Sequence, residues 1–215
     1  MINLIGAYIV LVAVLAVITR RQSILSFMAR LEQSGRFCWL PVLVVLSGIG
    51  WQQTTIDPLI PRALDLIHLP HYLLFAITLW IHEAGHLYFA IFGRFMQVAG
   101  GTLNQLLFPA ALCLISYRHG LLKNMLLGVF WIGFSCIDVS RYVGDASSRR
   151  LPLLGAHQDS HDWHYLLSTT DLLAWDRIFS SCFFYLGVFL TIAAMTGIAA
   201  QTFRRSSASP IPPVT

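Results

Sequence analysis

Apolar runs long enough to cross a lipid bilayer recur along most of this chain. A transmembrane helix needs about 20 predominantly apolar residues. Of the 215 residues, 56% are hydrophobic and only 11% are charged, whereas a soluble domain carries about 25% charged residues. A chain this poor in charge cannot cover a globular surface with polar groups. The sequence therefore predicts an all-α fold, a polytopic bundle of transmembrane helices.

The apolar runs predict about five to six spans. They lie at residues 2–19, 37–51, 71–92, 121–143 and 178–200, with a weaker run at 103–117. The weaker run contains Pro109 and follows the pair Gly100-Gly101, which we expect to break the chain. We expect it to be a short span or a re-entrant segment, since irregular backbone at membrane depth must be buried in protein or line a wet cavity.

The distribution of charge bears on orientation and on partners. The net charge of +4 comes almost entirely from arginine, and Lys123 is the only lysine. Four arginines between residues 20 and 36 predict that this loop is cytoplasmic, because basic loops stay on that side. No basic stretch is interleaved with aromatic residues, so we expect no nucleic-acid partner. The expected partner is the lipid bilayer, and we expect a multi-pass protein of the bacterial inner membrane.

The run at residues 71–92 contains the motif His82-Glu83-Ala84-Gly85-His86. Residues i and i+4 project from one helix face, so the two histidines can bind one metal ion together. Glu83 lies beside them, where it can act as general base on a zinc-bound water. Ionisable residues within a span cost about 2.5–3.5 kcal/mol each and tend to mark function. The motif therefore predicts a zinc site, and Gly85 predicts close approach of another backbone.

A hydrolytic zinc site usually takes three protein ligands and leaves one position for water. The third ligand must therefore come from elsewhere in the chain. Asp138 and Asp145 follow or end an apolar run, and either could instead cap a helix or pair with Arg141. The later polar loop offers further ligand types, and from the residues alone the choice stays open among Asp138, Asp145, His157, Asp159, His161, Asp162 and His164.

A polar, glycine-bearing segment follows the motif. Gly100-Gly101-Thr102 is succeeded by Asn104-Gln105. Such a segment could hold an extended substrate backbone by pairing along it. Alternatively, it is a turn followed by the first residues of a helix.

Together these features resemble a known family. HEAGH in a membrane helix, the Gly-Gly-Thr…Gln segment and a later helix ending in an aspartate motif resemble the site-2 protease type of intramembrane zinc metalloprotease. The closer likeness is to its small M50B-like branch, in which we expect residues 142–146 and the run His161-Asp162-Trp163 to be signatures. The resemblance covers about residues 71–175.

The resemblance implies Zn²⁺ as cofactor, Glu83 as catalytic base, and His82, His86 and an aspartate as metal ligands. We expect the aspartate to be Asp145, with Asp138, His161 and Asp162 as alternatives. The implied activity is hydrolysis of peptide bonds in membrane-embedded protein or peptide substrates.

The resemblance also suggests a division of the chain into three parts. Residues 1–70 would form N-terminal helices and loops, residues 71–200 a metalloprotease-like membrane core, and residues 201–215 a disordered tail.

Two other functions fit parts of the pattern. A membrane di-iron oxygenase would use His82 and His86 with His157, His161 and His164 as histidine boxes, although such enzymes generally need more histidines. A non-catalytic membrane protein could keep the metal for stability alone. Metal content and the effect of Glu83→Gln separate these alternatives from a zinc protease.

Overall fold

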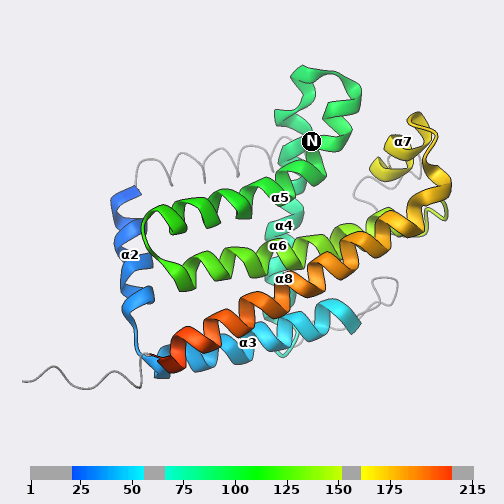
Figure 1. Cartoon of the computed structure of the whole chain (residues 1–215). Coiled ribbons are helices and arrows are strands. Elements are labelled where there is room, and N and C mark those ends of the chain that lie inside the picture. Colours follow the sequence, from blue (N-terminus) through cyan, green and yellow to red (C-terminus); the bar gives the residue numbers. More distant parts are fainter. Residues whose placement is uncertain (1–20, 56–65, 152–160, 205–215) are drawn as a thin grey trace, which may run out of the picture.

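A computed structural model of the chain describes residues 21–55, 66–151 and 161–204, and this part is helical with no strand (Figure 1). The predicted all-α fold is thereby confirmed. The predicted first span at residues 2–19 lies outside the described residues, as does the tail beyond residue 204. The elements in chain order are α2 (Arg21–Gln33), α3 (Arg36–Thr55), α4 (Leu69–Tyr88), η1 (Ala90–Phe92), α5 (Arg94–Arg118), α6 (Leu122–Gly144), α7 (Asp162–Thr169), η3 (Leu173–Trp175) and α8 (Asp176–Arg204).

Helix α6 is at the centre of the arrangement. It forms a hairpin with α5 and packs along α8, while α4 packs against α5 and runs across the direction of these helices (Figure 1). The hairpin turns at Gly120, whose φ of 67° lies in the left-handed region. The Leu121 N–H donates to the Ser116 carbonyl over 2.9 Å, which closes the end of α5 in the manner of a Schellman motif.

Three helical segments in the described part are long and apolar enough to cross a membrane: Arg94–Arg118, Leu122–Gly144 and Leu173–Arg204. Helices α2 and α3 pass the same test only together, as a pair bent by 98°. The predicted count of five to six spans is therefore not confirmed. Helix α4, predicted as a span over residues 71–92, is absent from the set, and its last two turns carry the polar motif.

Large apolar side chains are exposed on the outside of the bundle. On α8 alone, Tyr185, Phe189 and Ile192 are at least 60% accessible. Monomeric soluble proteins rarely expose contiguous apolar surface of this kind, whereas lipid tails solvate it at no cost. The exposed surface therefore agrees with the membrane setting that the composition predicts.

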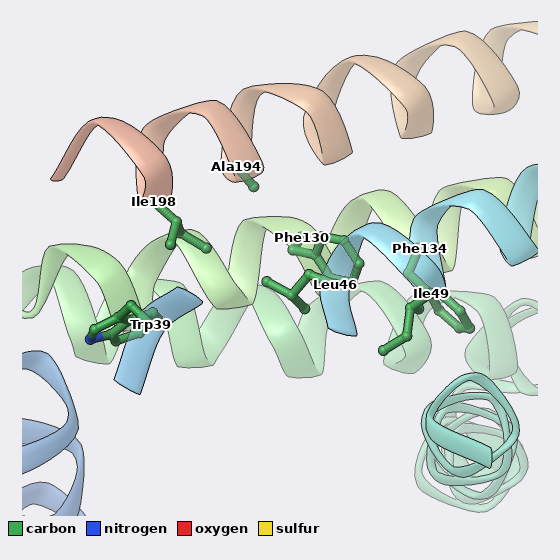
Figure 2. Close-up of a cluster of buried hydrophobic side chains, with 7 residues drawn as sticks. All are labelled: Trp39, Leu46, Ile49, Phe130, Phe134, Ala194 and Ile198. Carbon is green, nitrogen blue, oxygen red and sulfur yellow. The ribbon is translucent and has the colours of Figure 1, made fainter. Parts of the chain in front are cut away.

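The main apolar core lies where α3 meets α6 and α8 (Figure 2). Trp39 and Phe134 are almost fully buried, and Ala194 and Ile198 complete the contact from α8. In lipid the driving force between helices is close packing of side chains rather than escape from water. This core fixes the position of α6, which also leads into the polar region described below.

The segment after the motif differs from its prediction. Helix α5 runs without interruption through Gly100-Gly101 and Pro109, so these glycines do not break the chain and no re-entrant turn follows them. The break occurs earlier, at Gly93, whose φ is 91°. Gly100 instead allows α5 to approach α4 closely, since a methyl group there would lie 2.6 Å from the Gly85 carbonyl oxygen. The close approach predicted for Gly85 is confirmed.

Candidate metal centre

The two motif histidines point at one carboxylate oxygen. His82 and His86 occupy successive turns at the C-terminal end of α4, and their rings lie 4.9 Å apart. The Nε2 atoms lie 3.1 Å and 3.2 Å, respectively, from Asp162 Oδ2. His82, His86 and Asp162 form the one group of potential metal ligands found in the described part of the chain.

The spacing of these three atoms matches that of zinc ligands. In a tetrahedral site with bonds of about 2.0–2.1 Å, neighbouring ligand atoms lie about 3.3 Å apart. Two imidazoles and one carboxylate, leaving one position open, are a donor set typical of catalytic zinc. The residues present therefore fit the ion that the sequence predicts, although the aspartate is not the one expected.

Glycine at position 101 lets α5 pack directly against the two Nε2 atoms. A methyl group on Gly101 would lie 2.5 Å from His82 Nε2 and 2.7 Å from His86 Nε2. A larger residue there would collide with both rings. The convergence of the two nitrogen atoms on Asp162 Oδ2 therefore depends on Gly101.

The opposite nitrogen of each ring is held by α5. His82 Nδ1 lies 3.0 Å from Gln105 Oε1, and His86 Nδ1 lies 2.9 Å from the Gln97 carbonyl oxygen. A carbonyl oxygen can only accept, so each Nδ1 carries the proton in these contacts. Each Nε2 faces the Asp162 carboxylate and would offer its lone pair to a bound metal ion. Orientation of a metal-binding histidine through its second nitrogen is a general feature of metal sites.

Asp162 is presented by the short helix α7, of which it is the first residue. His161 caps this helix by accepting from the His164 N–H over 3.2 Å. The Asp162 N–H donates to the Tyr142 hydroxyl over 3.0 Å, and Trp163 Nε1 donates to Thr102 Oγ1 over 3.2 Å. These bonds attach the start of α7 to α6 and α5, and so fix the carboxylate against α4.

The Asp162 carboxyl is ionised at neutral pH. Burial works to raise its pKa, but the adjacent His82 and His86 outweigh burial and lower the pKa to about 2. A carboxylate is therefore available as an anionic ligand over the physiological range.

Asp145, the predicted third ligand, is not in the cluster. It caps the end of α6, and its carboxylate accepts from the Arg150 and Leu151 N–H groups, each over 2.9 Å. Burial raises the pKa of this carboxyl, but hydrogen bonds from Ser148 and these N–H groups lower it overall. Its acceptor sites are thus used in folding the loop after α6, and the expected ligand moves from Asp145 to Asp162.

The other predicted alternatives also have separate positions. Asp138 Oδ2 accepts from Gln105 Nε2 over 2.8 Å, on the side of Gln105 away from the His82 contact. His161 Nε2 lies 3.4 Å from Asp145 Oδ2, and burial lowers the pKa of His161 so that the ring stays neutral. His164 Nδ1 is held 2.8 Å from the Ala146 carbonyl oxygen. His157 and Asp159 lie outside the described residues.

Glu83 is half-buried on α4 and adjacent to His82. Its carboxylate interacts electrostatically with His86 and with Tyr142. It is not part of the group formed by His82, His86 and Asp162.

The centre lies toward one end of the helices rather than halfway along them. Gln97 belongs to the first turn of α5, and Tyr142 to the last turn of α6. The motif likewise occupies the C-terminal end of α4.

Sequence reasoning missed Gln97, and it named Tyr142 only as part of the expected signature at residues 142–146, without a role. Gln105 was singled out, but for holding substrate rather than His82. Comparison with protein-family models, with curated proteins and with solved structures found no match to this chain.

Proposed function

We propose that the chain is a zinc-dependent hydrolase of the membrane, of the intramembrane metalloprotease type, with His82, His86 and Asp162 as the metal ligands. The convergence of two Nε2 atoms on Asp162 Oδ2, at 3.1 Å and 3.2 Å, is the observation that carries the proposal. Gly101 supports it, because a side chain at this position would collide with both Nε2 atoms. The chain would be a multi-pass protein of the bacterial inner membrane.

A bound zinc ion would lower the pKa of a water molecule toward about 7 and polarise a substrate carbonyl. The residues of the chain supply the rest of the chemistry. Gln105 and Gln97 hold the two imidazoles in one tautomer, which leaves both Nε2 lone pairs for the metal. Asp162 adds a negative charge that balances part of the charge of the ion.

Glu83 is the proposed general base. Its carboxylate would take a proton from the attacking water and return it to the leaving amine, a role that contributes about 10²–10⁴ in rate in other enzymes. The electrostatic interaction of Glu83 with His86 supports this role, and Glu83 is not part of the ligand group.

A membrane peptide is the proposed substrate. The exposed apolar surfaces of α5 and α8 support a bilayer setting, in which substrates are membrane segments that diffuse laterally. The resemblance to site-2 proteases supports peptide hydrolysis in particular.

The bonds of His161 and His164 favour this function over a di-iron oxygenase. His161 is used to cap α7, and His164 is held by the Ala146 carbonyl. Neither ring belongs to the group formed by His82, His86 and Asp162.

Glu83→Gln tests the proposal. The variant should keep its zinc and cleave a membrane substrate at least about 100-fold more slowly than wild type. Asp171→Asn is a matched control, because this exposed acid lies outside the centre, and it should cleave normally. Cleavage by Glu83→Gln at the wild-type rate would refute the proposed catalytic base. If zinc stabilises the fold but neither wild type nor Asp171→Asn cleaves the substrate, the site is structural.

A further inference from the structure

We propose that Asp138 is a positioning residue for the metal centre, acting on His82 through the side-chain amide of Gln105. The inference rests on the proposed metal site, and it assigns to Asp138 a role other than ligand. Three side chains from three helices form the chain of contacts: Asp138 from α6, Gln105 from α5 and His82 from α4.

The contacts form a continuous line. Gln105 Nε2 donates to Asp138 Oδ2 over 2.8 Å, and Gln105 Oε1 faces His82 Nδ1 over 3.0 Å. Gln105 is only 3% accessible, so water does not compete for its amide. His82 Nε2 lies on the far side of the ring, 3.1 Å from Asp162 Oδ2.

The carboxylate matters because an amide by itself has no preferred direction. A glutamine side chain can turn its oxygen or its nitrogen toward a histidine, and the ring can adopt the matching tautomer. Asp138 Oδ2 accepts from the Gln105 amide nitrogen, so Asp138 selects the orientation in which that nitrogen faces it. The amide oxygen then faces His82, which carries a proton on Nδ1 in this contact. In a zinc-bound protein the lone pair of Nε2 would face the metal.

The same outcome is reached differently at the second histidine. His86 Nδ1 is held by the backbone carbonyl of Gln97, whose direction is fixed by helix α5. His82 has a side chain as its partner, so it needs a further group to fix that side chain. Asp138 supplies this group, and Arg141 lies one turn further along α6 and interacts electrostatically with its carboxylate.

A reversal of the polar groups provides the test. Asp138→Asn puts an amide, which can turn a donor or an acceptor toward Gln105, in place of the carboxyl group, and Gln105→Glu places two carboxyl groups in contact. Each single variant should bind zinc about 10–100-fold more weakly, the usual effect of losing a partner of a metal-binding histidine. The double variant Asp138→Asn/Gln105→Glu restores an acceptor beside His82 and a donor beside that acceptor. It should bind zinc with an affinity within about threefold of wild type. Each substitution would then compensate for the loss of affinity caused by the other.

Gln53→Glu is the matched control, because Gln53 is also buried and also contacts a histidine, with Oε1 2.7 Å from His71 Nε2. It should leave zinc affinity unchanged. Affinity is measured on purified full-length protein in detergent, by competition with a chelator. Single variants that bind like wild type would overturn the inference. The inference would also be overturned if the double variant lost as much zinc affinity as the two single variants together. The losses would then reflect local disruption of the structure.

Nitrogen NMR on the metal-free protein separates this inference from the proposed function. With ¹⁵N-labelled histidine, the resonances lost in His82→Gln identify the ring. They should show a proton on Nδ1 in wild type and partial loss of that proton in Asp138→Asn. A wild-type protein that binds no zinc would refute the proposed function, and the NMR result would still decide the role of Asp138. An Nδ1 without a proton in wild type would overturn that role.

Discussion

The apolar core and the metal centre are both buried, yet they are stabilised in different ways. The core brings together Trp39, Phe130 and Phe134 with small and branched side chains of α8 (Figure 2). Its stability comes from many weak contacts, each of which can be replaced by another apolar group of similar volume. In the centre each polar atom of His82 and His86 has one assigned partner. A single exchanged group there leaves another group without its partner.

One ridge of α6 joins the two regions. Phe130, Phe134, Asp138 and Tyr142 follow one another at intervals of four residues, so they lie along one side of the helix. The first two pack in the core, and the last two contact Gln105 and Asp162. The core therefore holds in place the helix that orients the centre. Mutations in the core should change the free energy of unfolding, and mutations in the centre should change zinc affinity.

Gly101→Ala should have the largest effect on the centre. The added methyl group would lie 2.5 Å from His82 Nε2, so it would displace this ring from Asp162 and abolish zinc binding. Gly48→Ala is the matched control, since a methyl group on Gly48 would meet nothing within 4 Å. The control should bind zinc normally and be more stable by up to about 1 kcal/mol. Metal analysis and thermal unfolding check both variants, and a Gly101→Ala protein that binds zinc normally would contradict the geometry.

Phe130→Ala should lower stability and leave zinc affinity nearly unchanged. Phe130 is only 2% accessible in the core, and removal of a buried aromatic side chain costs about 3–5 kcal/mol. The free energy of unfolding should fall by this amount, whereas zinc affinity of the folded protein should change by less than about threefold. Denaturant unfolding in detergent and chelator competition measure the two quantities. A large loss of zinc affinity without loss of stability would show that the regions are not separable.

Helices α6 and α8 and two of the three proposed ligands could be predicted from the sequence. The run at residues 121–143 corresponds to α6 at Leu122–Gly144, because apolar residues predominate in it. His82 and His86 follow from the helical repeat alone. Their common direction is a local property, so no knowledge of the tertiary fold is needed.

The third ligand could not be predicted in the same way. Asp162 lies on a separate short helix, and its place depends on the Tyr142 and Trp163 hydrogen bonds. Asp145 has the same chemistry and lies closer along the sequence, but the loop N–H groups of Arg150 and Leu151 use its oxygens. Only tertiary contacts distinguish the two carboxylates. The same holds for Gly100-Gly101, which favour a chain break locally but serve helix packing in the fold.

Trp163→Phe should have the smallest effect. It keeps the aromatic contact with Phe183 but removes the bond from Trp163 Nε1 to Thr102 Oγ1. A single hydrogen bond contributes about 1 kcal/mol, so zinc affinity should fall by several-fold through weaker attachment of α7. Hydrogen exchange of the α7 amides should increase in parallel. Unchanged exchange and affinity would show that Tyr142 alone suffices to attach this helix.

The zinc content of Asp162→Asn, compared with that of Asp145→Asn, tests the central claim most directly. Both variants remove one negative charge and keep the size of the side chain, so they differ only in which carboxylate is changed. Purified wild-type protein and Asp145→Asn should each contain about one zinc ion per chain, and Asp162→Asn should lose it. Retention of zinc by Asp162→Asn together with its loss from Asp145→Asn would contradict the proposed ligand set.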